Sequence, residues 1–331
     1  LNIGEVMKYR MMLSIVVAGL CTMMTVTATA GTAGTAPKRA DKDNSGETIQ
    51  RTPRGVFDQQ QNVVSSIAFQ TTNYGIFGFD VRNGVGGTFW PRGRRNQYIF
   101  AGGAWFGARK RPPGSQNLRK LVSITYNPNS GLSWMVPGTI EEGDEVLTSS
   151  DAINKYRTYF STDFSQQDGL DFANPTFPRW PIWDTNPDDT IRYSNYYGLY
   201  VNEPASRVRT TYPKGPAFIS EEDVFCVYKD TDLNYYEGGV TKRKADGYPL
   251  GMQIEQMVYS WGFGDYADFV FLKYMFIHPE KYKDTLFDCW MAAVQDVDIA
   301  LATNPVGGAQ NDRARFYQSD PSLNLAVHWT D

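Results

Sequence analysis

The stretch EEDVFCVYKDTD, residues 221–232, decides the fold class that we predict for this chain. Its apolar centre, Val224 to Tyr228, has the length of a β-strand, carboxylates stand at both ends, and it contains one cysteine. A second stretch, FDCWMAAVQDVD at residues 287–298, repeats the design and also ends in Asp-x-Asp. Because both are typical of core strands, we expect them to lie close together in one sheet or in two facing sheets.

The rest of the chain also favours strands. Aromatic residues make up 14% of the sequence, and aromatic side chains favour pleated, half-buried surfaces. The 30 Gly and 18 Pro residues separate apolar runs of strand length, such as Met252 to Trp261 and Phe269 to Ile277. We therefore predict an all-β fold, an antiparallel β-sandwich of the jelly-roll-like or immunoglobulin-like kind. Long loops rich in aromatic residues and proline would connect its strands.

One short helix is expected within this β-fold. Ile153, Tyr156 and Phe160 recur at helical spacing, and Ser149 or Ser150 can cap the helix at its start. The prolines of the following segment, residues 174–187, exclude a central strand or a helix there.

The N-terminal region has the pattern of a secretory signal peptide. A basic segment from Met7 to Arg10 precedes an uncharged run from Met11 to Val26 and then Ala28-Thr29-Ala30, a small-x-small cleavage pattern. The alternative is a transmembrane anchor, for which the run is short. We expect residues 1–30 to be the signal peptide, starting at Met7, and residues 31–55 to be a flexible linker. Residues 56–331 would form the β-sandwich domain or domains, truncated at the C-terminus.

Charge and motifs exclude several partners. The net charge of −4 gives no basic field that would attract nucleic acid. No glycine-rich loop is followed by the Lys-Ser/Thr pair of a nucleotide-binding loop, and the two histidines, His278 and His328, stand in no zinc or nucleophile motif. We therefore expect neither nucleic acid nor nucleotide as a ligand. After signal cleavage the protein would be extracellular or on the cell surface, with no membrane span.

The Asp-x-Asp endings are candidate metal ligands. Alternate residues of a strand point to one face, so Asp230 with Asp232, and Asp296 with Asp298, would each present two carboxylates on one side. Four such oxygen donors brought together would suit Ca²⁺. The alternative is that aspartate is simply a common turn residue at wet strand ends.

A carbohydrate site is the second candidate. Glycoside hydrolysis needs two carboxyl groups about 5 to 10 Å apart beside aromatic platforms. Weak catalytic candidates are Glu255, Asp230 and Asp296. Sugar platforms would come from Trp180, Trp183 and Trp261. The alternative is coincidence, because the chain has 36 acidic residues and some pair will always look suitable.

Two cysteines, Cys226 and Cys289, remain once the signal peptide is removed. They are candidates for a disulfide, since exported proteins can keep disulfides and the two stretches are so alike. Two buried free thiols are the alternative.

The order of several motifs resembles large exported proteins of unknown activity from Bacteroidota-like bacteria, many of which end in a type IX secretion sorting domain. The motifs are residues 73–78 (NYGIFG), 102–108 (GGAWFGA), 223–232 (DVFCVYKDTD), 249–251 (PLG) leading to Gln256 and Trp261, and 296–298 (DVD). This sequence lacks the sorting domain. The resemblance implies an address and an architecture and no reaction. We therefore expect a secreted or cell-surface protein with a binding or envelope-structural role, Ca²⁺-stabilised, whose partners are polysaccharide or other surface components. A carbohydrate-active hydrolase is the alternative.

Overall fold

The computed structural model describes residues 10–18, 57–146, 156–160, 219–234, 242–301 and 311–330. Its strands are β1 (Arg10–Ala18), β2 (Gln59–Gln61), β3 (Gln70–Thr72), β4 (Phe79–Asp80), β5 (Val85–Gly86), β6 (Thr88–Phe89), β7 (Gln97–Ile99), β8 (Ala101–Lys110), β9 (Arg119–Ile124), β10 (Val136–Pro137), β11 (Tyr159–Phe160), β12 (Glu222–Lys229), β13 (Gln253–Ser260), β14 (Phe269–Ile277), β15 (Phe287–Asp296), β16 (Asp312–Phe316) and β17 (Ala326–Thr330). Three short 3-10 helices are η4 (Lys244–Asp246), η5 (Gly264–Asp268) and η7 (Pro321–Leu323). None of the helices in these ranges has the length and apolar character needed to cross a membrane.

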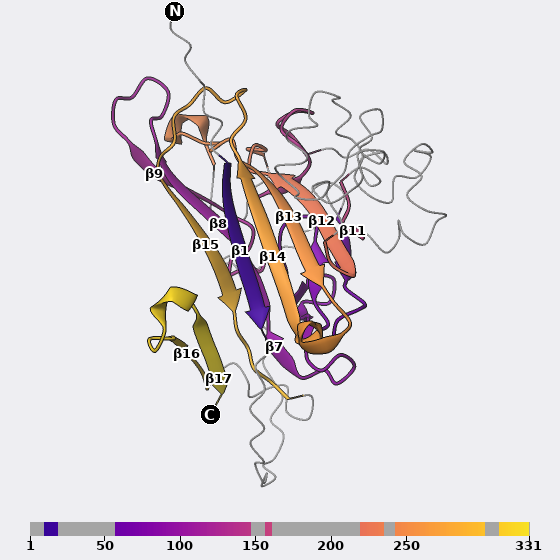
Figure 1. The fold of residues 1–331 in the computed structure, drawn as a ribbon. Helices are drawn as coiled ribbons and strands as arrows, with labels where there is room; N and C mark the ends of the chain where they lie inside the picture. Colours follow the sequence, from indigo (N-terminus) through magenta and orange to yellow (C-terminus); the bar gives the residue numbers. More distant parts are fainter. Residues whose placement is uncertain are drawn as a thin grey trace, which may run out of the picture.

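The described part of the chain is mostly β, with several antiparallel sheets (Figure 1). The largest sheet has the order β1-β14-β13-β12-β10, and β11 also pairs with β12. A second sheet has the order β15-β8-β9, and four hairpins complete the described strands. The apolar runs 252–261, 269–277 and 287–294 thus form β13, β14 and β15, as the sequence predicts.

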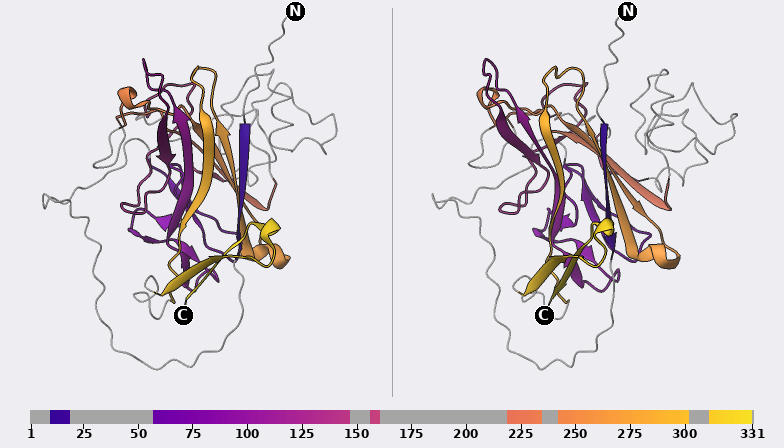
Figure 2. Two further views of the ribbon diagram at one scale, coloured as in Figure 1. Left: turned by 90° about the vertical axis from the view of Figure 1, so that its left-hand side faces the viewer. Right: turned by 60° about the vertical axis from the view of Figure 1, so that its left-hand side comes forward.

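The two sheets share one hydrophobic core. Val258, Leu272 and Phe276 of the larger sheet belong to the same buried cluster as Ala104 and Phe106 of β8. The rings of Phe106 and Phe276 lie 5.7 Å apart between centroids. Figure 2 shows β8 and β15 in one sheet and β13 and β14 in another, in two further views. This shared core holds the two Asp-x-Asp strands, β12 and β15, in different sheets.

Strand β12 is buried along its whole length. Its alternate residues Val224, Cys226 and Tyr228 enter the shared core, whereas Phe225 and Val227 enter a second cluster on the opposite face of the sheet. Both faces are covered, which explains why the sequence of this strand is apolar without alternation.

The predicted helix is wrong in the part that the structure describes. Tyr159–Phe160 forms β11 and pairs with β12, and no α-helix of seven or more residues occurs in the described ranges. Tyr159 lies in the second cluster and Phe160 in the shared core, so neighbouring residues serve opposite faces, as in a strand. Pairing with β12 thus overrides the helical spacing. Ser149, Ser150 and Ile153 lie outside the described residues.

Candidate ligand-binding surface

The outer face of the sheet β15-β8-β9 carries the most exposed large hydrophobic side chain among the described residues. Trp290 of β15 is 74% exposed. Its neighbours Cys289 and Met291 pack against the shared core, so by strand alternation Trp290 points away from that core. A tryptophan held on a paired strand with its ring in solvent is typical of a contact site, because exposed aromatic side chains are enriched at interfaces.

A β-bulge positions this tryptophan. Phe287 pairs with Arg109 and Trp290 pairs with Gly107, so Asp288 and Cys289 together oppose the single residue Ala108. Asp288 has φ of 47°, in the left-handed region that aspartate tolerates better than most residues. Bulges re-aim side chains and are common beside functional sites. Asp288 and Trp290 are both exposed, as alternate residues of a strand with one buried face are.

Charged groups adjoin the tryptophan. The carboxylate of Asp288 lies 2.8 Å from the guanidinium of Arg109, and both side chains are about half exposed. Gly107 of β8 pairs with Trp290, and because glycine has no side chain, the position directly opposite the indole is open. Trp105 follows two residues earlier on that face, with its indole N–H donating to the Tyr126 carbonyl at 2.8 Å. We call these five residues, Trp105, Gly107, Arg109, Asp288 and Trp290, the β15 surface.

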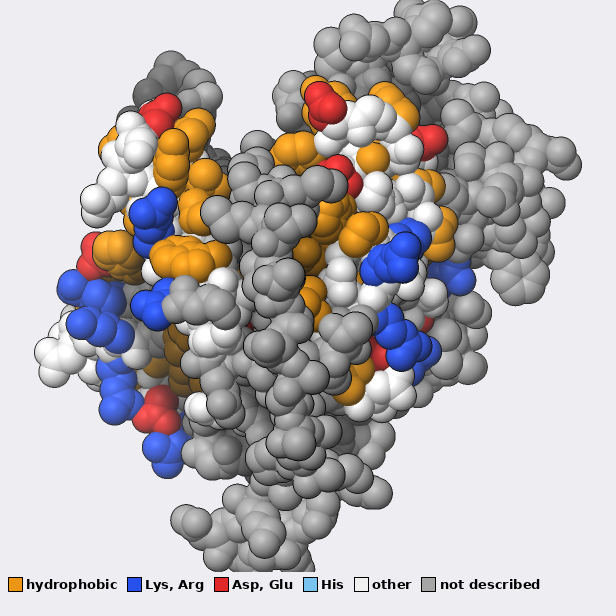
Figure 3. All heavy atoms as spheres, turned by 90° about the horizontal axis from the view of Figure 1, so that it is seen from below, with side chains coloured by type: hydrophobic (Ala, Val, Ile, Leu, Met, Phe, Trp, Pro, Cys, Tyr) orange, Lys and Arg blue, Asp and Glu red, His pale blue; other side chains and the backbone are white. Residues whose placement is uncertain are grey.

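Other exposed hydrophobic side chains lie in less regular places. They include Phe263 and Tyr266 at η5, Phe316 on β16, Leu323 and Leu325 near η7, and Trp329 on β17. Seen from below, the described residues expose hydrophobic side chains beside Lys and Arg side chains in two groups (Figure 3). A two-stranded hairpin and a 3-10 turn position side chains less firmly than a three-stranded sheet on a core. The β15 surface is therefore the stronger candidate.

The tryptophans named from the sequence lie elsewhere. Trp261 is half-buried and packs edge-on against Phe271, with ring centroids 5.6 Å apart, and against Tyr266 at the same distance. Its ring is thus engaged by its own sheet. Trp180 and Trp183 lie outside the described residues.

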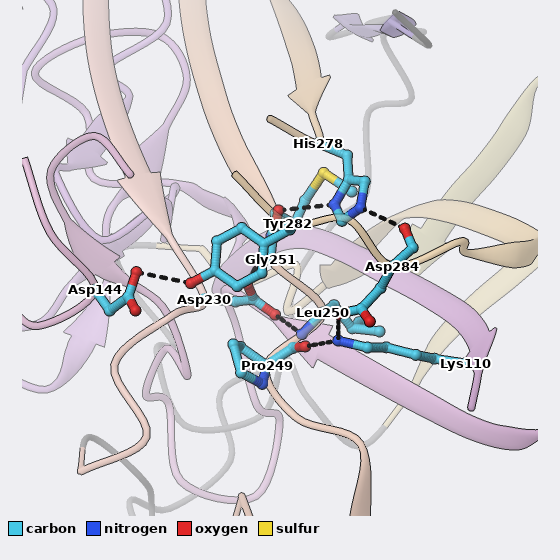
Figure 4. A network of polar contacts seen from close by, with 10 residues as sticks. Lys110, Asp144, Asp230, Pro249, Leu250, Gly251, His278, Tyr282 and Asp284 are labelled. Carbon is cyan, nitrogen blue, oxygen red and sulfur yellow. Dashed lines mark hydrogen bonds and ion pairs between the residues drawn. The ribbon is translucent and has the colours of Figure 1, made fainter. Parts of the chain in front are cut away.

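Asp230 has a structural environment. Its side chain is fully buried, and its two oxygens accept hydrogen bonds from the backbone N–H groups of Leu250, at 3.0 Å, and Met252, at 2.7 Å (Figure 4). Burial raises the pKa of this carboxyl, and the nearby charge of Lys242 opposes that rise. The carboxylate therefore fixes the segment that leads into β13.

A ring of polar side chains surrounds the same segment, residues 249–251 (Figure 4). The ammonium of Lys110 donates to the Pro249 carbonyl at 2.6 Å and lies 2.8 Å from Asp284. The two ring nitrogens of His278 lie 3.0 Å from the carbonyls of Gly251 and Asp284. Gly251 has φ of 74°, and a Cβ there would come within 2.5 Å of the Tyr282 ring. Each polar group contacts protein, so this network serves to hold the sheets' ends together.

The four aspartates of the metal hypothesis do not converge. Asp232 accepts from the backbone N–H groups of Asn234 and Val146, close in sequence to Asp230. Asp296 pairs with Ala101 at one end of β8, whereas Lys110, which contacts Pro249 beside Asp230, ends that strand. Ten strand residues span about 30 Å. The two pairs therefore lie at opposite ends of the shared core. Asp298 follows Asp296, and its carbonyl accepts from Gln97.

Within the described residues, no three His, Cys, Asp or Glu side chains form a group that could hold a metal ion. Ca²⁺ stabilisation stays a prediction, and the described residues give it no such site.

The three carboxylates of the hydrolase hypothesis are likewise separate. Asp296 accepts a hydrogen bond from the Tyr126 hydroxyl at 2.6 Å. Glu255 is buried on β13, and its neighbours in the strand place it on the opposite face from the shared core. There it approaches Lys273, whose pKa is lowered by burial and raised in part by Glu255. Asp230, Glu255 and Asp296 thus occupy three different environments.

Of the two alternatives for the cysteines, the structure has the free thiols, since Cys226 and Cys289 are not bonded to each other. Cys226 is buried on β12 with its thiol 3.5 Å from the Thr72 carbonyl, and Cys289 is half-buried against the same shared core. Burial raises the pKa of both thiols, so neither is activated as a nucleophile. The expectation that the two cysteines share one core is met, because the core places their strands in its two sheets.

The opening carboxylates of β12 are buried as well. Glu222 accepts from the Val63 N–H at 2.8 Å, and Asp223 accepts from the Ser220 N–H at 2.8 Å. Burial raises the pKa of Glu222, and it raises the pKa of Asp223 to about 6. Glu222 thus holds the segment at Val63, and Asp223 holds the segment at Ser220, to the start of β12.

Sequence reasoning missed the β15 surface because it treated residues 287–294 as a second core strand. One signal was present: Asp288, Trp290 and Ala292 alternate with Cys289 and Met291, a pattern of one exposed and one buried face.

Comparison of the chain with protein-family models, with curated proteins and with solved structures found no match.

Proposed function

We propose that this chain is an exported β-sandwich protein, secreted or held at the cell surface, that binds carbohydrate or another envelope component through the β15 surface. The observation that carries the proposal is Trp290, 74% exposed on a paired strand beside a glycine. The sandwich is supported by the core cluster that both sheets share. Export is supported by the signal-peptide pattern of residues 7–30 and by the family resemblance.

The chemistry of the surface fits a sugar. The C–H groups on one face of a pyranose ring form an apolar surface that packs against the flat apolar face of an indole, and both surfaces are removed from water by the contact. Sugar hydroxyls need donors and acceptors next to that ring. Arg109 supplies N–H donors and Asp288 supplies carboxylate acceptors, and the two are already paired at 2.8 Å. A surface of this kind holds a chain from one side and leaves it intact.

The hydrolase alternative has less support. A glycosidase needs two carboxyl groups about 5 to 10 Å apart. The two carboxylate oxygens of Asp230 already accept hydrogen bonds from two backbone N–H groups, and Asp296 lies at the opposite end of the shared core. We therefore place the protein among binders, without a proposed reaction.

Retention on a panel of immobilised polysaccharides tests the proposal, with Trp290→Ala as the variant. Loss of an anchoring aromatic contact is expected to weaken binding about tenfold or more. The matched control is Phe263→Ala, which removes an aromatic side chain that is 60% exposed on a different part of the molecule. Equal retention of the two variants would contradict the assignment of the site. Release of reducing sugar by the intact protein would instead support the hydrolase.

Export has a separate test. N-terminal sequencing of protein secreted by a Gram-negative host is expected to find Gly31 as the first residue, because the small-x-small pattern ends at Ala30.

A further inference from the structure

The outer edge of β14 is covered by a segment that the mature protein would lack. Strand β1, Arg10–Ala18, pairs antiparallel with all nine residues of β14, from Arg10 opposite Ile277 to Ala18 opposite Phe269. Figure 1 shows β1 alongside β14, on the side away from β13. Residues 10–18 are also the end of the basic segment and the first half of the uncharged run of the predicted signal peptide. Cleavage after Ala30 would therefore leave β14 as an open edge.

That open edge would be long and regular. Val270, Leu272, Tyr274 and Phe276 belong to the shared core, and β13 pairs with the other edge of β14, so contacts that do not involve β1 also hold the strand in place. Its register with β1 runs without a bulge, and β14 contains no proline. Bulges and prolines are two features that usually protect the edge of a natural sheet, because the unpaired N–H and C=O groups of an edge can pair with another strand.

We propose that the outer edge of β14 is a strand-acceptor site, which in the mature protein takes an extended apolar segment of a partner polypeptide in antiparallel register. The proposal goes beyond carbohydrate binding, and it rests on the export and cleavage proposed above. Main-chain hydrogen bonds along the edge would give affinity, and the residues opposite β14 would give specificity.

The charge on the edge selects the partner. Lys273 is the only charged residue of β14 and stands at its centre, and the residue opposite it in β1 is Ser14. Two copies of β14 paired over their full length would place Lys273 opposite Lys273, and like charges directly opposite one another are destabilising. Any shifted register would leave part of the edge unpaired. The edge therefore favours a different sequence, about nine residues long, apolar, with a small or acidic residue at its centre.

The test begins with the full chain, so that the protein starts from the folded state described here. A specific protease site is placed within residues 31–55, and the chain is cut after folding. A fluorescent peptide of residues 10–18 is then added as the probe. We expect the cut segment to stay bound through gel filtration or to exchange with one peptide per chain. In both cases hydrogen exchange of the β14 amides is expected to be slow while a strand is bound.

Variants of the peptide and of the edge examine the chemistry. The same peptide with N-methyl groups on alternate amides, those that face β14, is expected not to bind, because the ladder cannot form. The S14K peptide is expected to bind roughly fivefold more weakly than the S14E peptide. Lys273→Gln in the protein is expected to abolish that preference, and it places no second carboxylate beside the buried Glu255. The matched control is Lys120→Gln, the same change at an exposed lysine of β9.

Several outcomes would overturn the proposal. One is loss of the cut segment without rebinding of any peptide, while the β14 amides stay protected. Another is a dimer of the cut protein with protected β14 amides, which would assign the edge to a second copy. A mature N-terminus that still contains residues 10–18 would also overturn it, by showing that β1 belongs to the finished fold. That last result would leave carbohydrate binding through Trp290 standing.

Discussion

Strands β12 and β15 have nearly the same sequence design and opposite environments. Both combine an apolar run, one cysteine and a following Asp-x-Asp. All eight residues of β12 are buried, whereas β15 alternates between half-buried and exposed positions from Phe287 to Ala292. The difference comes from their neighbours. β12 has paired strands on both sides and a hydrophobic cluster on each face, whereas β15 is an edge strand with one face on the core. The first strand builds the fold, and the second offers a surface.

The outward residues carry this difference. In β12 they are Phe225 and Val227, two apolar side chains that are buried in the second cluster. In β15 they include Asp288 and Trp290, a charge and an amphipathic ring. Total hydrophobicity is therefore a poor guide to burial here, and the composition of alternate positions is a better one.

The largest expected effect is a contrast between two aromatic side chains. Phe225→Ala is expected to lower the free energy of unfolding by about 4 kcal/mol, because Phe225 is fully buried and its loss leaves a cavity. Trp290→Ala is expected to change it by no more than about 0.5 kcal/mol, since the indole is mostly in solvent. Urea denaturation measures both. A similar cost for the two variants would mean that Trp290 is covered in solution.

The second contrast concerns the strand ends. Asp230→Ala is expected to cost about 3 kcal/mol, because it leaves two buried N–H groups without an acceptor and removes one of the two carboxylates near Lys242. Asp296→Ala removes one hydrogen bond from Tyr126 and is expected to cost about 1 kcal/mol.

Urea denaturation of both aspartate variants, at one pH, gives the difference. Asp230→Asn is a useful third variant because it keeps an acceptor and removes the charge. If Asp296 proved the more costly residue, the difference between the two strand ends would be reversed.

Much of the fold could be predicted from the sequence, and the site could not. The runs at 252–261, 269–277 and 287–294 are apolar enough, and bounded clearly enough, to specify strands. Strand order decides which carboxylates lie close together, and no local sequence pattern indicates that Asp230 and Asp296 lie near opposite ends of β8. The helix prediction failed at Tyr159 and Phe160 for the same reason, because β11 is made by its pairing with β12. The exposure of Trp290 could have been predicted, because exposed and half-buried residues alternate around it.

The third expected effect is a pH dependence that belongs to β12. Burial raises the pKa of Asp223 from 3.8 to about 6, so the folded protein holds this proton more tightly than the unfolded chain. The resulting stabilisation is complete below pH 3.8 and is lost as the pH rises through about 6. It amounts to at most about 3 kcal/mol, since each unit is worth about 1.4 kcal/mol.

Asp223→Asn removes this titration, so its unfolding free energy should fall less than that of the parent between pH 4 and pH 6. Thermal or urea unfolding across that range provides the comparison. If the unfolding free energies of the two proteins changed in parallel with pH, Asp223 would be ionised in the folded state throughout this range. The start of β12 would then be more hydrated than the burial of Asp223 indicates.

The smallest expected effect is at the two cysteines, one in each of the two strands. Cys226→Ser places a hydroxyl in the shared core and is expected to cost about 1 kcal/mol, reduced by its hydrogen bond to the Thr72 carbonyl. Cys289→Ser acts at a half-buried position and is expected to cost a few tenths of a kcal/mol. Labelling of the native protein by a thiol reagent provides an independent measure, in which Cys289 should react first because Cys226 is wholly buried. Mass analysis of the non-reduced protein is the decisive control: a loss of two hydrogens would reveal a bond between the thiols. It would show that β12 and β15 approach one another more closely than two free thiols require, and neither serine variant could then be interpreted as a local change.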